Sequence, residues 1–275
     1  MQTSIQLFYR YLRNVDLVRQ GRRAGWRFLY GCLGAGLFFL LWLTIGYTVF
    51  TRPGYEQFSG FLPIPTLKAL YGLLFDGDFW HSVIASLRRV MLGISIAFVL
   101  GLPVGILIGF YHRLRLITYT PFQFLRMISP LSWMPIALLV FHSFEAAIYF
   151  LITMATVWPI ILNTGHGVSQ VNPRWIDMAR NQGASDRQLM VQIILPASIP
   201  YILTSLRLAL GVAWIVLVPA EYLGISSGLG YFINDARDTM EYDRLMAVII
   251  AIGIVGFLLD GGIELVQRAF SWRMG

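Results

Sequence analysis

The sequence predicts an all-α integral membrane protein with six transmembrane helices. Of its 275 residues, 57% are hydrophobic and only 13% are charged, which is too apolar for a single soluble core. The apolar residues come in long blocks, each near the roughly 20 residues that a helix needs to cross about 30 Å of hydrocarbon. The arginines fall mainly between these blocks, as in membrane proteins whose basic loops stay on the cytoplasmic side.

Six apolar blocks define the expected spans, which together make one membrane domain over residues 28–270. Before them, apolar residues recur at helical spacing between arginines in residues 1–27, which predicts an amphipathic helix on the inner membrane surface; a partner-contact helix is the alternative. The apolar run that follows is too long for a signal peptide, so we expect it to remain as an anchor. The expected spans are Phe28–Phe50, Val83–Phe110, Ile128–Phe141, Ala146–Asn163, Ile202–Tyr222 and Leu245–Phe270.

The basic residues sort to one side of these spans. The opposite loops hold only Arg52, Lys68, Arg237 and Arg244, so both termini and the loop at 174–200 are expected to be cytoplasmic. The side with more arginines carries Arg10, Arg13, Arg19, Arg22, Arg23, Arg27, Arg113, Arg115, Arg126, Arg174, Arg180, Arg187, Arg268 and Arg273.

Glycines and prolines suggest how the spans pack and where a route could run. The second span has glycines four or eight residues apart, at Gly93, Gly101, Gly105 and Gly109, so a neighbouring helix can approach that face closely. The third and fourth spans are short and broken by prolines, which points to a translocation pathway. Candidate lining residues are Trp133, Thr156, Trp158, Asn163 and Glu221.

The two aromatic candidates and Glu221 also have plainer interpretations. The aromatic residues suit an interfacial belt or internal packing equally well. Glu221 is placed for an outer gate or for contact with a delivery protein, or it is a solvated helix end. Arg207 and Asp260 fall at similar depths of the fifth and sixth spans, so a structural ion pair is predicted, because each charge alone is costly in hydrocarbon. A role at an inner gate is the alternative for this pair.

Several functions are disfavoured by what the chain lacks. It has no phosphate-binding Gly-x4-Gly-Lys motif, and Lys68 is its one lysine, so ATP and magnesium are not expected to bind here. The four histidines and the single Cys32 form no metal-ligand or nucleophile pattern. The net charge of +7 is explained by membrane topology rather than by nucleic acid binding. We therefore expect neither catalytic residues nor a metal site.

The polar stretch "DMARNQGASDRQLMVQIILPASIP" lies between two apolar blocks and has a definite spacing. Asp177, Met178 and Ala179 are followed after three residues by Gly183, after nine more by Ile193, and after one more by Leu195 and Pro196. Two short helices joined at Gly183, the second stopped by Pro196, would make a rigid lever. This stretch resembles the cytoplasmic coupling loop of ABC importer permeases, with Asp177 and Met178 departing from the family's Glu and first Ala.

Other segments resemble the nitrate, sulfonate, taurine and bicarbonate branch of that family, among them "SPLSWMPIALLVF", "VWPIILNTGHGV" and "GVAWIVLVPAEYLG". The resemblance implies a type I importer permease fold in a bacterial inner membrane. It also implies a homodimer, two cytoplasmic ABC ATPase subunits that carry ATP and magnesium, and an extracytoplasmic substrate-binding protein. Nitrate, nitrite or bicarbonate is the favoured substrate, followed by alkanesulfonates or taurine. The alternative is an anion carrier driven by an ion gradient.

Overall fold

The computed structural model describes residue 26 and residues 29–50 and 52–271, and within these ranges every regular element is a helix. The chain divides into two compact units, residues 1–69 and residues 70–275. Each unit is described by itself below. The expected amphipathic helix at 1–27 falls almost wholly outside the described residues, and the single domain over 1–275 stays a prediction.

The first unit contains one span-length helix, Leu29–Phe50, followed by the short 3-10 helix η1 (Glu56–Phe61) and the start of α2 (Pro63–Leu73). The indole of Trp42 donates a 3.0 Å hydrogen bond to the carbonyl of Phe61, and the ring centres of Phe50 and Phe61 lie 5.6 Å apart. These contacts fold the η1 segment back on the end of the helix.

The second unit is built on four long helices. They are α3 (Gly77–Phe110), α6 (Phe144–Ser169), α9 (Leu195–Gly224) and α11 (Tyr242–Ser271). The 34 residues of α3 extend for about 51 Å at roughly 1.5 Å per residue, so α3 exceeds the thickness of the hydrocarbon. The apolar core lies where α3, α6 and α9 meet, and it includes Val90, Ile148, Leu151, Ile152 and Leu217.

The glycine face of α3 packs against α6, as the sequence predicts for a close helix–helix contact. A Cβ on Gly105 would lie 2.8 Å from the carbonyl oxygen of Ile161, and one on Gly109 would lie 2.5 Å from the Cβ of Val168. Cβ atoms on Gly93 and Gly101 would likewise come too close to the side chains of Ile152 and Ile160, respectively. These four glycines therefore serve packing within the chain, and the backbones approach where side chains are absent.

The structure differs from the prediction in the region of the third expected span, Ile128–Phe141. Residues 112–127, which look like a basic loop, form the helix α4 (His112–Met127). After a break, η2 (Pro130–Trp133) and α5 (Met134–Val140) follow, and the two halves are bent by 85°. Pro130 restricts the residue before it to extended backbone, which ends the first half. Five helices in the described ranges are long and apolar enough to span a membrane, and the number rises to six when this bent pair is counted as one span.

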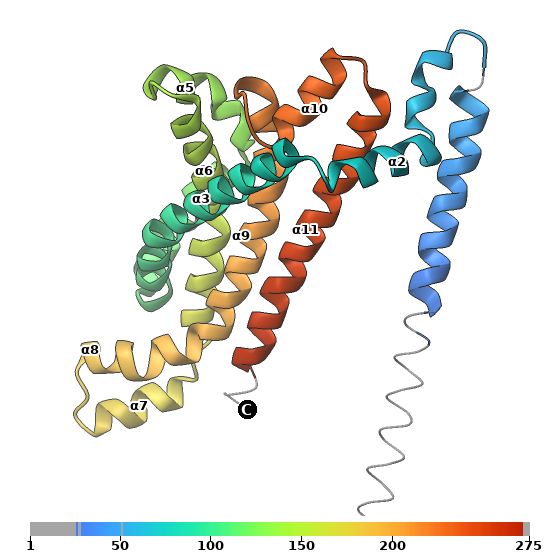
Figure 1. Ribbon diagram of the computed structural model, residues 1–275. Coiled ribbons are helices and arrows are strands. Elements are labelled where there is room, and N and C mark those ends of the chain that lie inside the picture. Colours follow the sequence, from blue (N-terminus) through green and yellow to red (C-terminus); the bar gives the residue numbers. More distant parts are fainter. Residues whose placement is uncertain (1–25, 27–28, 51, 272–275) are drawn as a thin grey trace, which may run out of the picture. The chain divides into compact units, whose positions relative to one another are not determined.

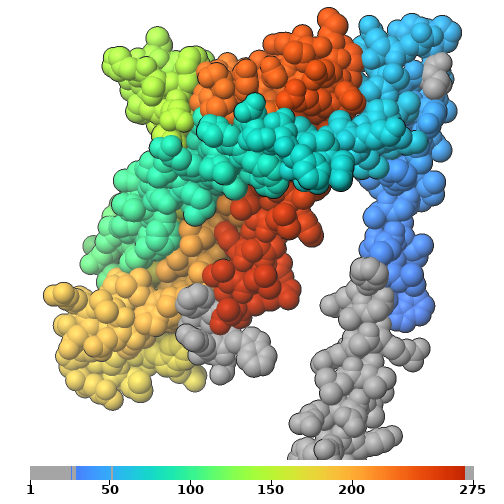
Figure 2. Space-filling view, viewed as in Figure 1, coloured from blue at the N-terminus to red at the C-terminus, as the bar shows by residue number. Residues whose placement is uncertain are grey.

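The two ends of the second unit carry different segments. In Figure 1 the short helices α7 (Pro173–Asn181) and α8 (Asp186–Leu189) lie at the same end as the C-terminal end of α11. The space-filling view shows α7 and α8 projecting there from the rest of the unit (Figure 2). The helix α10 (Leu229–Asp238) and α5 lie at the opposite end.

The prediction that Pro196 stops the second loop helix is wrong. A π-helical turn, η3 (Met190–Ile194), joins α8 directly to α9, and Pro196 stands in the first turn of α9. A π-helical turn shifts the hydrogen-bond register, and a proline in a first helical turn has no N–H that needs a partner there. The helical path from Asp186 to Gly224 is therefore continuous.

Candidate functional site

The first part of the candidate site is the loop helix α7, whose start and end are both fixed by the local sequence. The side chain of Asn172 accepts a 3.0 Å hydrogen bond from the backbone N–H of Arg174, and Pro173 occupies the first helical position. This is a favourable N-cap.

Gly183 ends α7 in a left-handed conformation, with φ of +83°. The N–H of Gly183 donates to the carbonyl of Arg180 at 2.9 Å, and the N–H of Ala184 donates to the carbonyl of Ala179 at 3.0 Å. This pair of bonds is a Schellman motif, in which glycine avoids the strain that a Cβ brings. The spacing of Ala179 and Gly183 in the sequence thus corresponds to the last turn of α7.

The second loop helix is also held locally and packs on the first. Ser185 and Gln188 form a capping box at the start of α8, which satisfies two N–H groups reciprocally. Ala179 and Leu189 are buried, and Ile194 joins a cluster with residues at the end of α6. The small side chain of Ala179 suits the close approach of the two helices.

The outward face of the loop is apolar as well as polar. Trp175 and Met178 are 51% and 57% exposed, and Val191 is 57% exposed. Of the predicted coupling residues, Asp177, Gly183 and Pro196 are also exposed, whereas Ile193 and Leu195 are half-buried. An exposed group of large apolar residues on a rigid projection is typical of a protein–protein contact.

We predict that Gly183→Val loosens α7. The backbone at φ of +83° disfavours a β-branched residue by about 1–2 kcal/mol or more, although no neighbouring atom would meet a Cβ there. Hydrogen exchange of the α7 amides should therefore quicken by roughly five- to thirty-fold. Gln182→Val, at a φ of −87°, is the matched control, and equal exchange rates in both variants would contradict this account.

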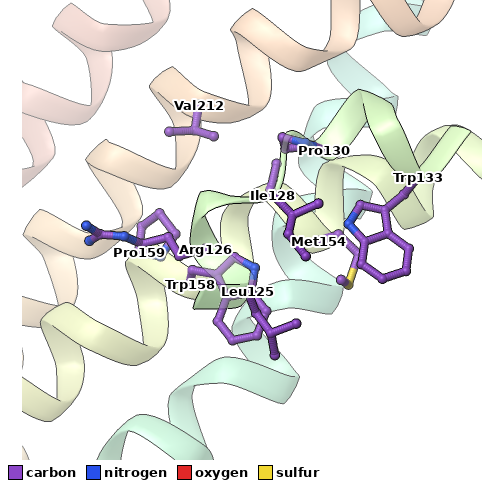
Figure 3. Close-up of a pocket in the computed structure, with 10 residues that line it drawn as sticks. Leu125, Arg126, Ile128, Pro130, Trp133, Met154, Trp158, Pro159 and Val212 are labelled. Carbon is purple, nitrogen blue, oxygen red and sulfur yellow. The ribbon is translucent and has the colours of Figure 1, made fainter. Parts of the chain in front are cut away.

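The second part of the candidate site is a cavity of about 230 Å³ at the break between α4 and η2. It is much larger than the roughly 10–15 Å³ that holds one water molecule, and its walls come from α4, η2, α6 and α9. Figure 3 shows Arg126, Trp158 and Pro159 on one side and Trp133 on the other. The lining residues are Leu125, Arg126, Ile128, Pro130, Trp133, Met154, Ala155, Trp158, Pro159 and Val212.

Only two of the five predicted pathway residues lie at the cavity. Trp133 and Trp158 line the cavity. Thr156 is fully buried and donates to the carbonyl of Ile152 in its own helix, and Asn163 donates to the carbonyl of Pro159. Glu221 is also fully buried, so it is neither a solvated helix end nor a cavity-lining residue.

Glu221 belongs to a buried ion cluster at the α10 end of the unit. Arg89 donates a 2.7 Å hydrogen bond to Glu221 Oε1, Ser86 donates to the same carboxylate at 2.8 Å, and the N–H of Gly230 donates to Oε2 at 3.0 Å. Arg89, which is only 2% exposed, also donates to Glu145 and to Ser227 at 3.1 and 2.8 Å. The cluster ties α3, α6 and α9 to the segment at residues 227–230, which includes the start of α10.

Two glycines allow this segment to lie on the cluster. Gly228 has φ of +104°, and a Cβ on it would lie 2.5 Å from the carboxylate carbon of Glu221 and 2.6 Å from Arg89 Nη1. A Cβ on Gly230 would lie 2.3 Å from the carbonyl oxygen of Val218. Only the absence of side chains at these two positions permits the contact.

A second group of charges, separate from the buried ion cluster, joins α9 to α11. Arg207 donates to Asp260 through two nitrogens, at 2.9 and 2.7 Å, and to Glu264 at 3.0 Å. Glu264 is also hydrogen-bonded to Arg268. The Arg207 and Asp260 side chains are 32% and 53% exposed.

Sequence reasoning did not single out Arg89, Ser86, Glu145 or Gly228, and it counted Arg126 as a loop residue. One signal was available for the buried cluster, because Arg89 and Glu221 are opposite charges that both lie in apolar segments and need partners there. The residues lie 132 positions apart, so their pairing required the fold. The depth of Arg126 could not be predicted without knowing that residues 112–127 form the helix α4.

Comparison with known proteins agrees with this architecture. A family model described as the binding-protein-dependent transport system inner membrane component matches residues 101–274. The chain is 38% identical over 252 residues to the bicarbonate transport system permease protein CmpB of Synechococcus elongatus, covering 87% of each. It is 35% identical over 208 residues to the nitrate import permease protein NrtB of Leptolyngbya laminosa, covering 72% of this chain and 74% of that protein.

Solved structures of similar fold have lower sequence identity and bear on the fold alone. A chain of the MetNI methionine ABC transporter in an inward-facing conformation aligns with a TM-score of 0.58 at 17% identity, covering 75% of this chain and 98% of that one. A chain of a bacterial alginate ABC transporter aligns with a TM-score of 0.59 at 16% identity, covering 90% and 95%. The fold is that of type I ABC importer permeases, and the chain belongs to the family of binding-protein-dependent transport system inner membrane components.

Proposed function

We propose that this permease is driven by two cytoplasmic ATPase subunits that bind the exposed face of α7 and α8. The observation that carries the proposal is the rigid connection from this loop into the membrane. Because α8, η3 and α9 form one continuous helical path from Asp186 to Gly224, a displacement of the loop is passed to a membrane helix without a flexible linker. ATP and magnesium bind to the ATPase subunits, and closure of those subunits tilts the loop and α9.

The proposed cargo is a small oxyanion, with nitrate, nitrite or bicarbonate ahead of alkanesulfonates and taurine. The relatives named above are a bicarbonate and a nitrate permease, and both anions are small and planar. The cavity of about 230 Å³ is below the roughly 300–1,000 Å³ typical of pockets for drug-sized ligands, which suits a small ion. An extracytoplasmic binding protein delivers the anion to the α10 end.

Two copies of the chain are proposed to form the route between them. Arg207, Asp260 and Glu264 support this arrangement, because each is partly exposed on membrane helices. Charged groups within a span favour a bundle interior or a water-filled route over lipid. The orientation proposed for a bacterial inner membrane places α7, α8 and both termini in the cytoplasm, as the basic residues there favour.

The experiment is uptake of isotopically labelled nitrate and bicarbonate into proteoliposomes that hold the chain with its proposed ATPase subunits. We expect uptake of one of these anions only when its binding protein is outside and ATP is inside. Uptake that follows a proton or sodium gradient without ATP would instead establish an ion-driven carrier.

A further inference from the structure

The cavity at the α4–η2 break is open to the surface, and its one charged lining residue is Arg126, which is exposed. The cavity also touches Ala155 and Trp158, near the middle of α6 (Phe144–Ser169), and Val212, near the middle of α9 (Leu195–Gly224). Both helices are long and apolar enough to span the membrane. Arg126 is therefore at the level of the membrane interior rather than at the cytoplasmic surface where its sequence position suggests it lies.

Arg126 also has no countercharge at this depth. Its guanidinium forms no ion pair or hydrogen bond with any other residue in the described ranges, and the residue is exposed where it lines the cavity. By contrast, Arg89 and Arg207 in the long helices both bind carboxylates, and Arg88 does not line the cavity. A cation at this depth is unfavourable in lipid and is normally found facing water or a bound partner.

The surroundings of Arg126 suit an anion of particular shape. The remaining walls are apolar or aromatic and include the indoles of Trp133 and Trp158. In Figure 3 the guanidinium of Arg126 lies beside Pro159, on the opposite side of the cavity from Trp133. The guanidinium has a planar fork of N–H donors that matches a planar oxyanion through two hydrogen bonds. Low-dielectric walls strengthen that attraction, and a single cation lets the ion leave again, as conduction requires.

We propose that Arg126 is the residue that a small planar oxyanion contacts inside the membrane, in the cavity that Trp133 and Trp158 also line. This inference rests on the proposed function and adds to it a binding position within each copy of the chain. The break between α4 and η2 supplies the position, because non-helical backbone at membrane depth is tolerated where it lines a cavity.

The test uses the full complex with its ATPase subunits and binding protein in proteoliposomes, and it measures nitrate and bicarbonate uptake. We expect Arg126→Gln to lower uptake by about tenfold or more, equivalent to ~1.4 kcal/mol, while the ATPase subunits still co-purify. Arg126→Lys should retain intermediate uptake with a changed nitrate-to-bicarbonate ratio, because an ammonium lacks the planar fork. Arg113→Gln, on the same helix, is the matched control and should transport as the wild type does.

Uptake by Arg126→Gln at the wild-type rate overturns the proposal and leaves the proposed function intact. If Arg126→Gln does not assemble, Arg126→Lys decides, since an unchanged rate and an unchanged anion ratio count against the proposal. A wild-type complex that takes up neither anion refutes the proposed function itself. An equal loss in Arg113→Gln would show that the effect is one of net charge, and it too would overturn the assignment to Arg126.

Discussion

Glu221→Ala should lower the free energy of unfolding in detergent by about 3–5 kcal/mol, because it leaves the buried Arg89 with only the half-exposed Glu145 as a carboxylate partner. Arg89 is 2% exposed and Glu221 is fully buried, and Arg89 lies 2.7 Å from Glu221. Removing one member of such a pair leaves the other charge buried without its closest partner, whereas removing both leaves no buried charge. We therefore expect the double variant with Arg89→Met and Glu221→Met to be more stable than either single variant.

Thermal unfolding in detergent measures this effect, with each kcal/mol shifting Tm by roughly 2–4 °C. Glu145→Gln is the control, because that side chain is 50% exposed and its loss should cost no more than about 1 kcal/mol. A double variant whose loss equals the sum of the two single losses would contradict the account, since independent contributions would then replace the coupled pair.

Gly228→Ala is expected to have the other large effect, about 2–6 kcal/mol from two causes. Its backbone has φ of +104°, a conformation that disfavours a side chain by about 1–3 kcal/mol. The new Cβ would also lie 2.5 Å from the carboxylate of Glu221, and overpacking of this kind adds about 1–3 kcal/mol. The segment before α10 would have to move off the ion cluster.

Gly183→Ala separates these two contributions. Gly183 has a similar φ of +83°, but no atom lies within 4 Å of the position that a Cβ would take there, so its variant carries backbone strain alone. Thermal unfolding of both variants should show the larger loss for Gly228→Ala. Equal losses would mean that the contact with Glu221 contributes nothing.

The loop could be predicted from the sequence because its determinants are local. Ala179 and Gly183 are close in sequence and form the end of one helix, and the cap residues Ser185 and Gln188 are three positions apart. The error at Pro196 has a local cause as well. A proline ends a helix when it interrupts the hydrogen-bond ladder, but the π-helical turn ahead of it places Pro196 in a first turn instead.

The cavity and the ion cluster could not be predicted in the same way. Ser86 and Glu221 are 135 residues apart. The periodicity of either helix does not indicate which residue of the other helix its polar side chains will contact. Hydropathy also does not predict the helix at 112–127, because the arginines of α4 lower its apolar character. A helix with a charged residue at its end, as α4 has in Arg126, is tolerated in a membrane when that residue faces a cavity. Whether a cavity is present depends on how the neighbouring helices pack.

The most direct test of the account is ATP hydrolysis by the reconstituted complex, measured with and without the anion-loaded binding protein, in wild type and Gly183→Val. We expect the loaded binding protein to stimulate hydrolysis in the wild type, and Gly183→Val to reduce the response because α7 no longer holds its shape, while Gln182→Val responds normally. Full stimulation in Gly183→Val, or a chain that never retains ATPase subunits, would contradict the role assigned to the loop.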